Sequence, residues 1–476
     1  MPQSLVIQVG QCGNQIGSRF WEQALAEHSQ TNRKAIYDES MATFFQNIER
    51  RGKRRAAVPV GDGTGQIKGL EARGLMIDME EGVINAMDGS PLRELFTPDQ
   101  ILTATSGSGN NWAVGHHHYG VQYGDHLRDM IRKQAEACDA LQSVFLIHSL
   151  GGGTGSGLGT RIAAFLADEL PDVYRFATVV APSPQHDDVV TSPYNAVLAL
   201  RHLAEHADAV VPVENQALMD ICAHAGVTDP KADTKPFGAM NQIVAQLMLN
   251  MTASMRFPGS LNVDINEITM NLVPFPALKY LLASMSPVAV RPAAGAPAAS
   301  VRVDRRVDQM FTEAFQPEAQ LIKCNPRTSV YVACAAMARG ALQVSDLRRN
   351  IDRIQKQLQF VWWNQEGWKT GLCHVPPATT TESLLTLSNN TCIAQSFAGI
   401  KTRFMKLYTR KANMHHYTEY MEKAEFTDAL ASLNSVIAEY RQVERDPGPQ
   451  DVEDDDWEAW ARAQVRGRVG SGMNGV

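Results

Sequence analysis

A short apolar run followed by a turn recurs along the first part of the chain. The runs lie at residues 5–9, 75–80, 101–105, 144–150 and 176–180. Apolar runs of this length are typical of buried strands, and helical apolar spacing follows the runs at 5–9 and 144–150. Repeated strand–turn–helix units predict an α/β fold with a doubly wound parallel sheet, which binds ligands at the carboxyl ends of its strands.

The turn at 151–157 is the richest in glycine. It reads GGGTGSG, with five glycines in seven residues. The run at 144–150 predicts a strand before it, and Leu158, Ile162 and Phe165 predict a helix after it. Backbone N–H groups without side chains, at the positive end of a helix, are suited to binding phosphate.

The best-known phosphate-binding motifs do not match this turn. The P-loop requires lysine after its last glycine, but Leu158 follows Gly157. The dinucleotide fingerprint G-x-G-x-x-G fails in every register, which counts against a nicotinamide-dependent oxidoreductase, as does the lack of an obvious acid–base constellation. A packed turn without a ligand remains the alternative at this point.

The bulk composition narrows the class of protein. The 476 residues fit two or three domains, and the net charge of −7 argues against a generally basic nucleic-acid binder. We expect no membrane span and no secretory signal, because no apolar run reaches the required length and the first residues lack a basic segment before an apolar core. Seven cysteines without a C-x-x-C pair indicate reduced thiols in the cytosol.

Two local features carry less information. His116, His117 and His118 are consecutive, so they cannot share one face of a helix and are poor local metal chelators. Residues 286–304 are rich in proline and alanine, which predicts a flexible or extended insertion.

Several segments resemble the tubulins, the GTP-binding proteins that build microtubules. The loop GGGTGSGLGT resembles the tubulin signature loop, and the resemblance covers about residues 2–443. The other matching segments, in tubulin order, are QVGQCGNQIG at 8–17, NNWAVGH at 110–116, SPYN at 192–195, RFPGSLNVDINEITMNLVPFP at 256–276 and RKANMHHYT at 410–418. Segments such as IDMEEGV and WNQEGWKT look most like the epsilon subfamily, which is associated with centrioles and basal bodies.

The resemblance implies a division of the chain. We expect a nucleotide-binding GTPase domain at 1–236, a long central helix at 237–258 and a second α/β domain, the intermediate or activation domain, at 259–392. A C-terminal helical hairpin at 393–445 and a disordered tail at 446–476 follow. The tail lacks the long glutamate-rich ending of alpha- and beta-tubulins.

The resemblance also implies that the turns form one site for GTP and Mg²⁺. Asp78 and Glu80, two apart at the end of a strand, are suited to holding Mg²⁺ directly or through water. Ser192 stands where tubulins usually have a glutamate that reaches the ribose. The residues expected to contact the nucleotide are Gly10, Gln11, Cys12, Gln15, Gly109, Asn110, Ser149, Gly152, Gly153, Thr154, Gly155, Ser156, Gly157, Asp188, Ser192, Asn215, Phe237 and Asn241.

Asp264 and Glu267 are the expected catalytic acids. They are three apart and share one face if the segment is helical. In alpha-tubulin the matching acids enter the nucleotide site of the next subunit and activate water. The resemblance therefore implies hydrolysis in trans on a neighbouring subunit, and the alternative is that both acids only favour a helix N-terminus.

Two functional classes follow from the resemblance. The first is a GTP-binding cytoskeletal protein of centriole and basal-body microtubules, located in the cytoplasm at the centrosome or cilium base. The second is a GTP-bound adaptor that does not polymerise. The insertion at 286–304 supports this class, because it falls where tubulins contact one another laterally and its proline- and alanine-rich sequence differs from that of the microtubule formers. Both imply other tubulins as partners, the first also centriolar proteins, and neither implies nucleic acid or membrane.

Overall fold

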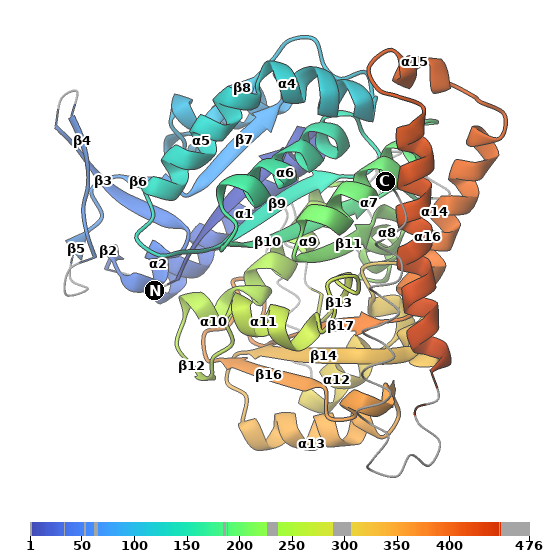
Figure 1. The fold of residues 1–476 in the computed structure, drawn as a ribbon. Helices are drawn as coiled ribbons and strands as arrows, with labels where there is room; N and C mark the ends of the chain where they lie inside the picture. Colours follow the sequence, from blue (N-terminus) through green and yellow to red (C-terminus); the bar gives the residue numbers. More distant parts are fainter. Residues whose placement is uncertain are drawn as a thin grey trace.

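Six parallel strands form the larger sheet of the computed structural model (Figure 1). The sheet order is β11-β10-β9-β1-β7-β8, so the chain winds outward in both directions from β1. This confirms the predicted doubly wound sheet. The strands are β1 Gln3–Val9, β7 Gly74–Asp78, β8 Ile101–Thr103, β9 Leu141–Ser149, β10 Tyr174–Ala181 and β11 Ala209–Glu214. The structure describes residues 2–32, 34–51, 54–60, 65–183, 187, 189–225, 237–288, 306–446 and 448.

Helices cover both faces of this sheet because successive strand side chains point to opposite faces. Val6 of β1 packs in one core, whereas Leu5 and Ile7 pack in the other. The first core includes residues of α1 Gly10–Thr31, α8 Asn215–His224 and α9 Phe237–Met251. The opposite face is covered by α5 Gly124–Glu136, α6 Gly159–Glu169 and α7 Ser192–His206.

A second sheet lies below the first in Figure 1 and mixes parallel and antiparallel pairs. Its order is β12-β16-β14-β17-β13, and β15 pairs with β14. The strands are β12 Gly259–Leu261, β13 Leu281–Ser286, β14 Val330–Arg339, β15 Gln359–Phe360, β16 Trp368–Cys373 and β17 Ser383–Asn390. Its helices are α11 Ile265–Leu272, α12 Val307–Ala314 and α13 Val344–Gln355.

One element of this sheet is shorter than its apolar sequence predicts. Residues 358–364 read LQFVWWN, but only Gln359 and Phe360 pair with β14, and a 3-10 turn follows at Trp362–Asn364. The Asn364 side chain donates a hydrogen bond to the carbonyl of Val332 at 2.9 Å, which turns the chain out of the sheet.

The central helix is also shorter than predicted. Its apolar stripe continues to Met255, but α9 ends at Met251 and a separate turn, α10 Ala253–Arg256, follows. The interruption falls at Thr252, whose hydroxyl donates to the carbonyl of Met248 at 2.9 Å. Side-chain bonds of this kind compete with regular helix geometry.

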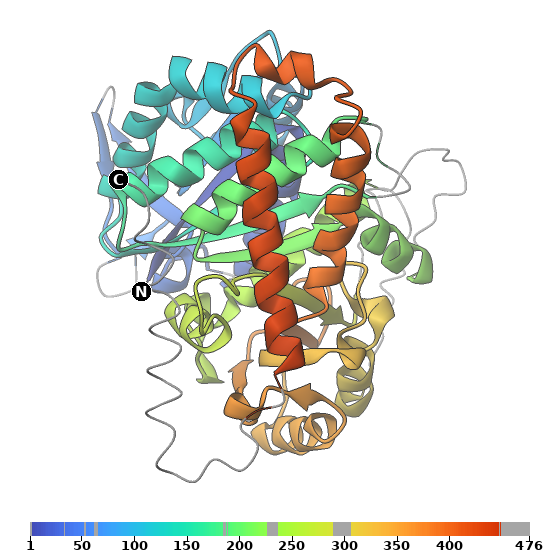
Figure 2. The same cartoon turned by 45° about the vertical axis from the view of Figure 1, so that its right-hand side comes forward.

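The C-terminal helices lie side by side across α7 (Figure 2). They are α14 Ile393–Tyr408, α15 Met414–Thr418 and α16 Ala424–Arg445, and their buried faces share a core with α7. The predicted helical hairpin is therefore confirmed. The tail at 446–476 lies outside the described residues except for 446 and 448, and the insertion at 286–304 lies outside them except for 286–288.

A buried ion cluster connects α1, which packs on the first sheet, with β14 of the second sheet and with α10. The Glu27 carboxylate of α1 contacts Arg339 of β14 and Arg256 of α10, each at 2.8 Å. All three side chains are at most 2% exposed. Burial acts to raise the pKa of Glu27, but the two guanidinium groups outweigh burial and hold that pKa below its usual value.

Candidate functional site

The turns after β1, β7, β8 and β9 meet at the carboxyl edge of the larger sheet. Three glycines mark the contacts. A Cβ on Gly10 would lie 2.9 Å from the backbone nitrogen of Gly155, and one on Gly107 would lie 2.8 Å from a Glu80 carboxylate oxygen. A Cβ on Gly153 would lie 2.5 Å from the Ser108 hydroxyl. The turns are therefore packed against one another as tightly as backbone allows.

The glycine run at 151–157 enters its helix through a wide turn. Thr154–Leu158 forms a π-helical turn before α6, a geometry that is frequent at functional sites. The Thr154 hydroxyl bonds Ser108 at 2.8 Å, and the Ser156 hydroxyl donates to the carbonyl of Gly152. The hydroxyl groups of Thr154 and Ser156, which were predicted to contact the nucleotide, are therefore engaged within the protein. The backbone N–H groups of the loop are the kind of group that can bind a phosphate.

The turn after β8 presents open backbone. Gly107, Gly109 and Asn110 have φ of +62°, +57° and +52°. A Cβ on Gly109 would meet nothing within 4 Å, so this backbone borders open space. Successive backbone N–H groups in turns often form a concave site for an anion.

Asp78 and Glu80, the residues predicted to hold Mg²⁺, lie beside the turn that contains Gly107. Asp78 ends β7 and is 2% exposed, whereas Glu80 is exposed. Burial, with the nearby charge of Glu80, raises the pKa of Asp78 to about 6. Its Oδ2 is buried without a hydrogen-bond partner among the described residues. An orphaned buried carboxylate oxygen beside a second carboxylate fits Mg²⁺, which takes oxygen ligands.

The start of α1 supplies the next group of predicted contacts. The 22-residue helix begins at Gly10, whose φ is +73°. Gln11 is exposed, and Cys12 and Gln15 are partly buried. Burial raises the pKa of the Cys12 thiol to about 12, so the thiol is protonated at neutral pH. A helix N-terminus pointing at the carboxyl edge favours an anion there.

The turn after β10 contributes an acid that the sequence analysis did not identify. The Ser192 hydroxyl donates to the carboxylate of Asp187, so a charge stands beside the position where tubulins usually have glutamate. Ser192 is buried, and a Cβ on Gly151 would lie 3.3 Å from its Cβ. The predicted Asp188 lies outside the described residues.

The residues predicted to hold the base come from α8 and α9. Asn215 begins α8 directly after β11, and Phe237 begins α9 with Asn241 one turn later. The two helices pack on each other, and α9 packs along α1. Phe237 is 44% exposed, which leaves part of its ring face accessible to a planar group. Residues 226–236 between these helices lie outside the described residues.

A buried asparagine ties this edge together. The Asn195 side chain donates to the carbonyls of Asn110 at 2.8 Å and Gly151 at 2.7 Å. Its oxygen accepts bonds from the backbone of Trp112 at 2.9 Å and the hydroxyl of Tyr417 at 2.6 Å. The sequence offered SPYN as a matching segment, but only the fold reveals this bracing role.

The predicted catalytic acids lie at the opposite edge of the sheet. Asp264 caps α11 by accepting the backbone N–H of Glu267 at 2.7 Å, and it contacts Gln142 near the start of β9 at 3.3 Å. Glu267 is 44% exposed and pairs with Lys369 at 2.9 Å. Because β9 has nine residues and strands rise about 3.3 Å per residue, the two edges are roughly 25–30 Å apart. These acids cannot reach the glycine turns of their own chain.

Comparison with known families agrees with this architecture. Residues 3–223 match the Tubulin/FtsZ family GTPase domain, and residues 276–402 match the Tubulin C-terminal domain.

The chain belongs to the tubulin family.

Two tubulin epsilon chains are similar to it over nearly their whole length. The tubulin epsilon chain of Homo sapiens is 51% identical over 472 residues, and that of Mus musculus is 49% identical. Each comparison covers 93% of this chain and 96% of the relative. The resemblance to the tubulins and to their epsilon members is therefore confirmed, and a tubulin GTPase domain implies GTP binding.

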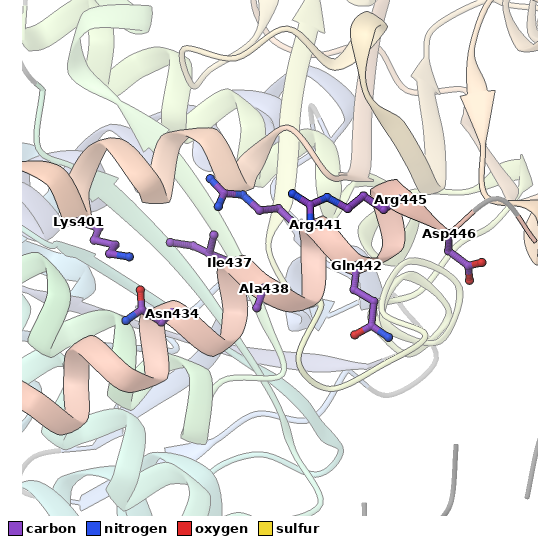
Figure 3. A pocket seen from close by; sticks show the side chains of 8 residues that line it. All are labelled: Lys401, Asn434, Ile437, Ala438, Arg441, Gln442, Arg445 and Asp446. Carbon is purple, nitrogen blue, oxygen red and sulfur yellow. The ribbon is translucent and has the colours of Figure 1, made fainter. Parts of the chain in front are cut away.

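Other features of this tubulin lie away from the turns. A groove of about 660 Å³ runs between α14 and α16, and its lining combines Lys401, Arg441 and Arg445 with Asp446 (Figure 3). All seven cysteines are free thiols. Among the described helices, none has the length and hydropathy needed to cross a membrane.

Proposed function

We propose that this tubulin binds GTP at the carboxyl edge of the larger sheet and acts in the microtubules of centrioles and basal bodies. The packing of three glycine-containing turns and the turn that holds Glu80 around open backbone carries the nucleotide part of the proposal. Similarity to tubulin epsilon chains supports a cytoskeletal role with other tubulins as partners. The centriolar partners and location follow from the sequence resemblance.

Each part of the edge has a role in this proposal. The N–H groups of the glycine loop and of the α1 N-terminus bind the phosphates, and Asp78 with Glu80 holds Mg²⁺. When bound, Mg²⁺ neutralises charge on the phosphate oxygens. Phe237 stacks on the guanine, whose edge bonds Asn215 and Asn241. The other residues predicted from the resemblance contact the nucleotide as well, and Asp187 joins Ser192 at this site.

Hydrolysis in trans is the second part of the proposal. A general base must lie within hydrogen-bond reach of the attacking water. Glu267 is roughly 25–30 Å from the turns of its own chain but half-exposed on the opposite edge, so it fits the nucleotide of a longitudinal neighbour. Asp264 positions it, because its cap fixes the first turn of α11.

The alternative is an adaptor that holds GTP without polymerising. The proline- and alanine-rich insertion at 286–304, at the position of the lateral loop, favours it. The two functions share a nucleotide site and differ in assembly, so filament formation separates them.

The test is nucleotide analysis of the purified full chain, followed by sedimentation with GTP. We expect GTP or GDP on release, and filaments alone or with other tubulins. A chain that carries nucleotide but enters only small complexes supports the adaptor. Recovery of no nucleotide after purification in Mg²⁺, or of a nicotinamide nucleotide, contradicts the site.

A further inference from the structure

Two histidines and a glutamate gather at the end of α7, away from the glycine turns. His202, Glu205 and His206 each offer one ligand atom, and these atoms all lie within 4.8 Å of one another. The two imidazole rings are nearly parallel, with centroids 6.1 Å apart. The glutamate approaches His206 at 3.8 Å.

Helix geometry explains why these side chains meet. Residues three and four apart lie on one face, so Glu205 and His206 both flank His202. Two imidazole nitrogens and one carboxylate oxygen are typical Zn²⁺ ligands, and a three-ligand protein site leaves a position for water.

An independent observation points to a missing ligand at this cluster. The Nδ1 atom of His202 is buried without a hydrogen-bond partner among the described residues. Buried ring nitrogens are normally satisfied, because an unpaired polar atom loses the hydrogen bonds that it makes to water in the unfolded chain. A metal ion coordinated through Nδ1 would satisfy it.

The surroundings hold the ligands in place. The His202 ring lies against His116, with centroids 4.4 Å apart, and against Trp112 at 5.3 Å. One oxygen of Glu205 pairs with Arg201 at 3.4 Å, and its other oxygen lies toward His206. Packing and second contacts of this kind orient metal ligands.

This cluster is separate from the nucleotide edge. α7 begins at Ser192 beside the glycine turns and ends at His206, 14 positions later, next to the start of β11. At about 1.5 Å per residue, the two ends are roughly 20 Å apart. The ligands remain accessible, since the side chains of Glu205 and His206 are 46% and 28% exposed.

We propose that His202, Glu205 and His206 bind one divalent transition-metal ion, with Zn²⁺ the best match to two imidazoles and a carboxylate. The site is independent of the proposed GTP function.

The test is calorimetric titration of Zn²⁺ into the full chain, which is first freed of transition metals. Excess Mg²⁺ and GTP are present throughout, so that the nucleotide site is filled. We expect one Zn²⁺ per chain. His206→Ala removes a partly exposed ligand and should weaken binding about 10- to 100-fold or more. The matched control is His415→Ala, which changes one of two adjacent exposed histidines on α15.

Further measurements separate a lost ligand from a damaged fold. Thermal unfolding of the metal-free His206→Ala chain should match that of the wild type. Cu²⁺ bound to the wild-type chain should quench the fluorescence of Trp112, whose ring lies 5.3 Å from that of His202. Comparison with Trp112→Phe shows which part of the quenched fluorescence comes from Trp112. No binding to the wild type, or equal binding by the wild type and His206→Ala, would overturn the proposal, as would a loss confined to His415→Ala.

Discussion

The buried ion cluster of Glu27, Arg256 and Arg339 should contribute strongly to the free energy of unfolding. Glu27→Gln keeps the shape of the side chain but removes its charge. Arg256 and Arg339, at 0% and 1% exposed, then lose their carboxylate partner at 2.8 Å. Removing one partner of a buried pair costs about 3–5 kcal/mol, because the remaining charge stays buried without compensation. We expect the free energy of unfolding to fall by that amount.

The same helix supplies a matched control. Glu22 of α1 pairs with Arg19 at 2.7 Å, but both side chains are about half exposed. Exposed pairs contribute about 0–1 kcal/mol, so Glu22→Gln should leave stability nearly unchanged. Urea unfolding at pH 7.5, followed by tryptophan fluorescence, measures both variants. If the free energies of unfolding of Glu27→Gln and Glu22→Gln differ by less than about 1 kcal/mol, burial of the Glu27 cluster does not make its loss costly, and the reasoning is refuted.

Three further predictions concern the cap, the pH response and the glycine turns. Asp264→Ala should lower the free energy of unfolding in urea by about 1 kcal/mol, because the variant loses the side-chain cap of α11. Asp264→Asn can still cap α11 and should not lower it. Equal losses of stability in the two variants would refute the capping role. Burial lowers the pKa of His28 to about 3 and of His148 to about 4, so the unfolded chain binds more protons at these two positions. Together these two histidines should contribute a loss of roughly 3 kcal/mol of stability between pH 6.5 and 5, and an unfolding free energy that does not fall over this range would contradict this. Gly10→Ala should weaken GTP binding at least about tenfold in equilibrium dialysis, because the φ of Gly10 is +73° and the new Cβ would meet Gly155 of the opposing turn. Gly82→Ala is the control and should bind GTP normally, since a Cβ on Gly82 would have no atom within 4 Å. Equal affinities of the two variants would refute the tight packing of the turns.

The sequence predicted the parts of the fold that local pattern determines. The apolar runs became strands of the parallel sheet, and the glycine turns met at its carboxyl edge, because the direction of parallel strands requires it. The predicted length of the central helix was wrong. The apolar residues continue to Met255, but they do not reveal that the Thr252 hydroxyl hydrogen-bonds the Met248 carbonyl and so competes with regular helix geometry.

Contacts between distant residues could not be predicted in this way. Glu27 and Arg339 are 312 positions apart, and the Asn195–Tyr417 bond spans 222. Asp187 was missed because Asp188 matched the family pattern, yet Asp187 accepts the Ser192 hydroxyl. The H-x-x-E-H spacing of α7 was visible in the sequence, but its orphaned nitrogen appears only in the fold.

A complementation assay tests the central claim that one subunit holds GTP and another supplies the acid. Glu267→Gln keeps the glycine turns, and Gly10→Ala keeps Glu267. GTP turnover is measured for each variant alone and for an equal mixture, under conditions in which the wild type assembles and hydrolyses GTP. We expect little turnover by either variant and recovered turnover by the mixture. Wild-type turnover by Glu267→Gln alone, or a silent mixture that still assembles, would contradict it.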